Sequence, residues 1–140
     1  MNEVRISITS DIIDCVKNGK TKLGLIDSPV TLKIRNELGS NNVADFQITD
    51  AAIKNGCLYL LGKNITPLLM TRLSLAYRYR DPEEDVIVET GTLDLVGLAV
   101  GETYQYVIDI PFTKPMEIII SGNPPSFMLV HFPTLKSEDK

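Results

Sequence analysis

Apolar and polar residues alternate along residues 73–110, and this alternation constrains the fold more than any other feature of the sequence. One alternating run ends at a turn around Pro82, and another follows a turn at Gly101. Because successive side chains of a β-strand point to opposite faces, a period of two is typical of half-buried strands. The region therefore predicts antiparallel β-structure.

Runs of the same kind recur through the rest of the chain, at residues 4–9, 30–35, 46–48, 116–122 and 127–132. Two Asn-Gly pairs, at 18–19 and 55–56, predict type I′ hairpin turns, because both central residues of such a turn need positive φ. The first pair places strands at residues 12–17 and 20–23. Only residues 49–54 and 66–72 are compatible with a turn of helix, so little or no helix is expected.

Turn signals recur about every 8–12 residues and separate about nine to eleven short strands, which indicates an all-β sandwich or barrel. We favour an immunoglobulin-like antiparallel sandwich, because the strands are amphipathic and their connections are uneven. Residues 1–136 are expected to form one such domain, and residues 137–140 a polar tail.

Residues 73–110 also resemble the second half of an FxLYD-type immunoglobulin-like domain. In that family a strand ends in Leu-Tyr-Asp, a second strand follows, and a Leu-x-Pro-Gly-Glu turn leads into a strand with alternating aromatic residues. The matching positions here are Tyr77, Tyr79 and Asp81, the strand 86–88 with its exit at Thr90-Gly91, and Leu98, Gly101, Glu102 and Tyr106.

The chain departs from the family pattern at two positions: Arg80 stands where the family has tyrosine, and Val100 replaces the proline. The resemblance implies an immunoglobulin-like sandwich and a role in adhesion, spacing or assembly. It implies no active site, because a fold alone does not determine a function.

The bulk properties exclude several classes of protein. The net charge of −4 and the lack of a basic cluster argue against nucleic-acid binding. Apolar runs are much shorter than the ~20 residues of a membrane-spanning helix, so no membrane insertion is expected. Residues 1–10 lack the pattern of a signal peptide, which favours a chain that stays in the cytoplasm or is assembled into a particle. Cys15 and Cys57 are expected to be buried free thiols, or a disulfide in an oxidising compartment.

Catalytic and metal-binding patterns are weak. His131 is the single histidine, and no nucleophile, base and orienting group occur together in a known motif. Four carboxylates surround Pro82, but their spacing matches no calcium loop, so a solvated acidic turn is the expectation. We therefore expect no catalytic residues, no metal and no cofactor.

Tyrosines are the residues best suited to contacts. Tyr77 and Tyr79 share one face of a strand, and Tyr104 and Tyr106 share one face of another. If the two strands are neighbours, the four rings form a cross-strand ladder. They then serve either as sheet packing or as a contact surface, since tyrosine is enriched at protein interfaces.

Three functional hypotheses follow from these patterns. The first is a non-enzymatic structural or protein-interaction module that binds a protein partner or itself, for example as a subunit of a phage or other virion particle. The second is a module that binds a small ligand or carbohydrate. The third, a hydrolase, has the fewest candidate groups in the sequence.

Overall fold

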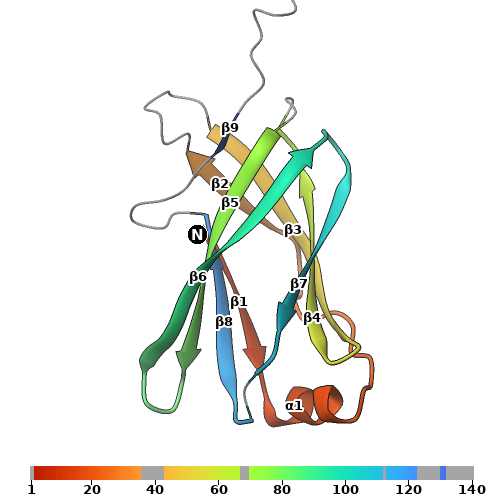
Figure 1. Cartoon of the computed structure of the whole chain (residues 1–140), viewed down its shortest axis with the longest axis vertical. Helices are drawn as coiled ribbons and strands as arrows, with labels where there is room; N and C mark the ends of the chain where they lie inside the picture. Colours follow the sequence, from red (N-terminus) through yellow and green to blue (C-terminus); the bar gives the residue numbers. More distant parts are fainter. Residues whose placement is uncertain (1, 36–42, 67–69, 112, 123–129, 132–140) are drawn as a thin grey trace, which may run out of the picture.

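The structure is a computed structural model that describes residues 2–35, 43–66, 70–111, 113–122 and 130–131. These residues form two antiparallel sheets (Figure 1). The first has the order β1 (Glu3–Ile8), β8 (Met116–Ser121), β5 (Met70–Asp81) and β6 (Val86–Leu98), with β9 (Val130–His131) paired to β5. The second has the order β2 (Val30–Arg35), β3 (Val43–Lys54), β4 (Cys57–Asn64) and β7 (Thr103–Asp109). The predicted all-β architecture is thus confirmed.

The core lies between the two sheets and consists mainly of aliphatic side chains. Alternate residues of β1 and β4 point inward, as the periodicity predicts; in β4, burial changes at every position. The largest fully buried side chains come from both sheets: Ile6, Ile8, Leu32, Ile34, Phe46, Ile48, Ile53, Leu58, Leu73, Leu75 and Leu98. Each such side chain contributes about 1.5–3 kcal/mol through burial, so this shared core holds the sheets together.

The hairpin predicted at Asn55-Gly56 is confirmed. Lys54 pairs with Cys57, and the two turn residues have φ values of 50° and 77°. These are the left-handed conformations that a type I′ turn needs. The turn aligns β3 and β4 and so sets the register of the second sheet.

The hairpin predicted at Asn18-Gly19 is wrong. The segment Ser10–Lys17 is a helix, α1, which buries Ile12 and Ile13. Gly19 has φ of 65° just beyond the last turn, where helices often end in a left-handed residue. Apolar residues at 12, 13 and 16 also fit the spacing of one helical face. The Asn-Gly signal therefore marks a helix end here, and α1 spans the lower end of the two sheets in Figure 1.

Several other sequence predictions are wrong, or concern residues outside the described part of the chain. Residues 49–54 belong to β3 rather than to a helical turn, and β6 continues past the exit expected at 90–91. Met70 already begins β5, so the helical turn at 66–72 is wrong in its described part. The tail at 137–140 and most of the strand expected at 127–132 lie outside the described residues.

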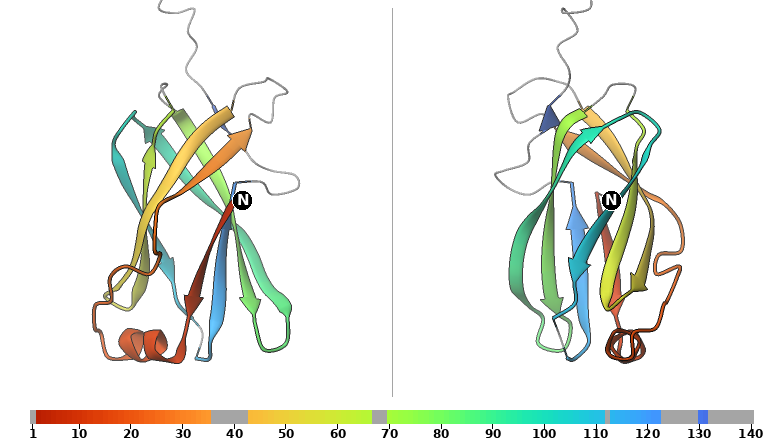
Figure 2. Two further views of the ribbon diagram at one scale, coloured as in Figure 1. Left: turned by 180° about the vertical axis from the view of Figure 1, so that it is seen from behind. Right: turned by 45° about the vertical axis from the view of Figure 1, so that its right-hand side comes forward.

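The two sides of the sandwich differ in how their edges meet. On one side, Asn2 bridges β1 and β2: its side-chain Nδ2 donates to Lys33 O at 2.8 Å, and Lys33 N donates to Asn2 Oδ1 at 2.6 Å. On the other side, β6 and β7 meet at their connecting turn and diverge toward the opposite end (Figures 1 and 2). The β1–β2 side is thus held together by Asn2, next to the start of β1.

Candidate functional site: a tyrosine groove beside the β6 edge

A groove of about 300 Å³ opens between the diverging strands β6 and β7. We call it the tyrosine groove, because Tyr77, Tyr79 and Tyr106 line it. Its other lining residues are Glu89, Thr92, Leu93, Val107, Ile108, Asp109 and Pro111. β5 and β6 supply one wall and β7 with the segment after it supplies the other, so the groove lies between the two sheets.

Tyr77 extends across the neighbouring strand to reach the groove. A Cβ atom added to Gly91 of β6 would overlap the Tyr77 ring, so the ring lies directly over this glycine. The Tyr77 hydroxyl donates to Glu89 Oε2 at 3.2 Å. Burial and this carboxylate both raise the pKa of Tyr77 above its usual value. Gly91 thus provides the space that brings an aromatic ring and a carboxylate together in the groove.

Tyr79 lies deeper and is almost fully buried. Its ring centroid is 5.2 Å from that of Tyr77, and its hydroxyl points toward Asp109 O at 3.5 Å. Burial, together with nearby negative charge, raises the pKa of Tyr79 to about 12. Tyr79 therefore forms the neutral floor of the groove and helps to join the two sheets.

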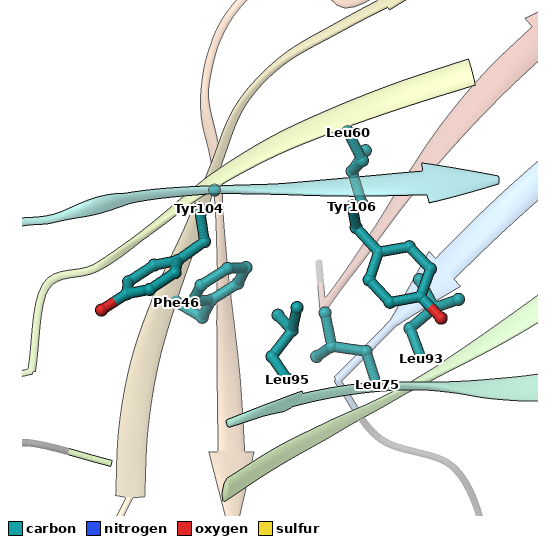
Figure 3. Close-up of a pocket in the computed structure, with 8 residues that line it drawn as sticks. Phe46, Leu60, Leu75, Leu93, Leu95, Tyr104 and Tyr106 are labelled. Atoms are coloured by element: carbon teal, nitrogen blue, oxygen red, sulfur yellow. The ribbon is translucent and has the colours of Figure 1, made fainter. Parts of the chain in front are cut away.

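The predicted cross-strand ladder of four tyrosines does not form, because β5 and β7 belong to different sheets. Tyr104 and Tyr106 instead point from β7 toward Leu75, Leu93 and Leu95 of the opposite sheet (Figure 3). Tyr106 also borders the tyrosine groove, whereas Tyr104 does not.

The Tyr104 hydroxyl fixes the connection between β6 and β7. It donates to Gly97 O at 2.9 Å and accepts a hydrogen bond from Ala99 N. These bonds occupy the hydroxyl in holding the turn. Of the four tyrosines selected from the sequence, the structure thus brings Tyr77, Tyr79 and Tyr106 together at one groove and gives Tyr104 a structural contact.

β6, the outer strand of this wall, is an edge strand of its sheet, which the sequence did not predict. Among the described residues, β6 pairs only with β5. Its residues 86–94, which we call the β6 edge, begin with the exposed apolar side chains of Val86, Ile87 and Val88. A β-bulge lies at Val88, where the register with β5 shifts. These three consecutive β-branched residues interrupt the alternation of apolar and polar residues. That interruption is the sequence signal that could have identified the edge.

Negative charge surrounds this edge. Glu89 and Asp109 line the groove, and neither has an ion-pair partner within the part of the chain that the structure describes. Arg78 and Arg80, by contrast, are on the opposite face of β5 and pair with acids. Arg80 contacts Asp85 at 2.6 Å and Glu117 at 2.8 Å. Glu89 therefore presents a carboxylate to the groove without an ion-pair partner among the described residues, while the nearest arginines of β5 are engaged elsewhere.

The acidic turn is only partly solvated, contrary to expectation. Asp81 is buried: one side-chain oxygen accepts the backbone N–H of Glu83 at 2.9 Å, and the other contacts Lys114 Nζ at 2.7 Å. The ammonium group holds the pKa of Asp81 below its usual value. Glu83, Glu84 and Asp85 remain exposed. Asp81 thus organises the turn that leads into the β6 edge.

The remaining candidate groups do not assemble into a site. Cys15 and Cys57 are free, half-buried thiols. His131 pairs with Arg72 through β9. Within the described residues, no group of three or more histidine, cysteine or acidic side chains is placed to hold a metal ion. None of the helical residues described is part of a helix long and apolar enough to cross a membrane.

Comparison with family models, with curated proteins and with solved structures finds no match to this chain. The tyrosine groove and the β6 edge must therefore be interpreted from their own geometry.

Proposed function

We propose that the chain is a non-enzymatic protein-interaction or structural module, and that its fold is an immunoglobulin-like sandwich. The observation that carries the functional proposal is the β6 edge. It exposes Val86, Ile87 and Val88 and pairs on one side only among the described residues. An exposed apolar edge strand readily pairs with a strand from another chain. The resemblance of residues 73–110 to FxLYD-type domains supports the same kind of role.

In this account a partner contributes an extended segment that hydrogen-bonds to β6 and covers the valine and isoleucine side chains. The tyrosine groove, next to the same edge, receives side chains from that segment. One form of the proposal is a subunit of a larger assembly, such as a virion particle, in the cytoplasm or within the particle. Native mass measured by light scattering at several concentrations separates self-assembly from binding to a different protein.

The experiment that tests the proposal is selection of binders from a library of random peptides. Selected peptides are then assayed against Val88→Lys, because a lysine on an edge strand opposes pairing. Val100→Lys is the matched control: Val100 is 51% exposed and Val88 is 53% exposed, but Val100 lies beyond the end of β6. We expect Val88→Lys to abolish binding and Val100→Lys to preserve it. Failure to select any peptide, or binding that survives Val88→Lys, contradicts the proposal.

A second candidate function is binding of a small ligand or carbohydrate. The groove of about 300 Å³ with three tyrosines favours it, because ligand sites combine aromatic walls with a few polar groups. Titration of a panel of mono- and disaccharides into the labelled protein, followed by amide NMR shifts, tests this function. Binding that requires Tyr77 supports it, and binding unaffected by Tyr77→Leu contradicts it.

A further inference from the structure

We infer that the partner of the β6 edge is an extended segment that carries a lysine or arginine, and that this cation enters the tyrosine groove beside Glu89. The inference rests on the proposed function and deepens it by naming the chemistry of the partner. Two features of the groove support it: its charge and its aromatic walls.

The charge of the groove is the first feature. Glu89 from β6 accepts the Tyr77 hydroxyl in the groove. Asp109 from β7 also lines the groove, and its Oδ1 lies 3.8 Å from Cys57 Sγ on the neighbouring strand. No described cation forms an ion pair with either one. A basic side chain from a partner would supply the missing positive charge, and an acidic one would be repelled. The charge of the whole chain, −4, acts in the same direction.

The aromatic walls are the second feature. The rings of Tyr77 and Tyr106 border the groove, and Tyr77 already donates its hydroxyl to Glu89. A cation near a tyrosine ring gains cation–π attraction, about 0.5–1 kcal/mol at exposed sites. The stem of a lysine or arginine is apolar and packs against such rings while the charged group reaches the carboxylates. Aromatic and acidic groups in one groove thus favour a long basic side chain over a small cation.

The β6 edge determines how the segment lies. Alternate side chains of an added strand point to opposite faces. One set therefore faces the interior side, where Glu89 and the tyrosine groove are, and the other faces the outer side with Thr90. The exposed triplet at 86–88 adds apolar contact at one end of the segment. The partner motif is consequently an alternating one, with a basic residue on its groove-facing set.

Two synthetic peptides test this inference directly. Both are about eight residues long, the length of an ordinary strand, and alternate threonine with valine; one carries lysine at two threonine positions and the other carries glutamate. Calorimetry measures their affinities for the wild-type chain. We expect the lysine peptide to bind at least about tenfold more tightly, which corresponds to about 1.4 kcal/mol. The difference should shrink as salt is added, since exposed charges are screened.

Variants separate the inference from the proposed function. Glu89→Gln with Asp109→Asn is expected to remove most of the preference for lysine while both peptides still bind. Val88→Lys is expected to weaken both peptides, and Val100→Lys neither. If both peptides bind equally and depend on Val88, the inference about the cation is overturned and the proposed function stands. If the preference for lysine survives removal of both carboxylates, the inference is overturned. If neither peptide binds, the inference is overturned and the result also counts against the proposed function.

Discussion

The side chain of Asn64 donates a hydrogen bond from Nδ2 to the backbone oxygen of Leu98 at 2.9 Å, and this bond joins β4 of one sheet to β6 of the other. Asn64 is fully buried. Its Oδ1 accepts the backbone N–H of Thr66 at 2.9 Å, and its backbone oxygen accepts that of Gly101 at 2.8 Å. Asn64, Ile65 and Thr66 match a glycosylation acceptor in sequence, but in the folded chain the amide is buried in this clamp.

Replacement of Asn64 by alanine should destabilise the protein by about 1–3 kcal/mol, because buried polar groups lose their partners. Leu98 O and Thr66 N are the groups affected. Urea unfolding followed by circular dichroism measures the change. Asn18→Ala is the control, since Asn18 is exposed at the end of α1 and its replacement should stay within about 0.5 kcal/mol. Equal effects of the two substitutions would contradict the clamp.

Gly91→Ala should destabilise the chain by about 1–3 kcal/mol, because the new methyl group would overlap the Tyr77 ring. In a Tyr77→Leu background the same substitution should cost much less, since the ring is gone. A double-mutant cycle from urea unfolding measures this coupling. Additive effects would show that the ring does not lie over Gly91.

Asn2→Ala should expose the β2 edge. Lys33 N donates outward to Asn2 Oδ1 at 2.6 Å, so its amide is bonded although β2 is an edge strand. We expect its hydrogen-exchange protection to fall at least about tenfold in the variant. The amides of Leu32 and Ile34 point the other way, toward β3, and serve as internal controls. Unchanged exchange at Lys33 would contradict the bridging role of Asn2.

Stability should decline at alkaline pH in a way that depends on Tyr79. Burial raises the pKa of its phenol from 10.0 to about 12, so the folded state holds the proton more tightly than the unfolded chain. The resulting stabilisation is complete below pH 10 and is lost as the pH rises toward 12. Urea midpoints measured across this range should fall less steeply for Tyr79→Phe than for the wild type. Parallel declines would argue against the raised pKa.

The sequence predicted those elements whose local signals agree with their tertiary environment. β4 and the Asn55-Gly56 turn follow directly from alternation and turn chemistry. The prediction for residues 10–17 was wrong because an Asn-Gly pair is compatible with both a hairpin turn and the end of a helix. The buried positions of Ile12 and Ile13, at the end of the sandwich, select the helix. That choice depends on long-range packing, which the local sequence does not contain.

The candidate site was predictable in its residues but not in its arrangement. Tyr77, Tyr79 and Tyr106 were identified from the alternating pattern, yet their meeting across two sheets depends on strand order. The space for the Tyr77 ring depends on Gly91, which sequence spacing alone does not connect to it. The β6 edge was not predicted because edge position is a property of the whole sheet.

Amide NMR shifts of the labelled chain, followed as the lysine peptide is added, show where an extended basic segment binds. We expect the largest shifts on residues 86–94 and on the lining of the tyrosine groove, with small shifts around Asn2 and Lys33 on the β1–β2 side. Largest shifts on the β1–β2 side, or no saturable shifts at all, would contradict this expectation.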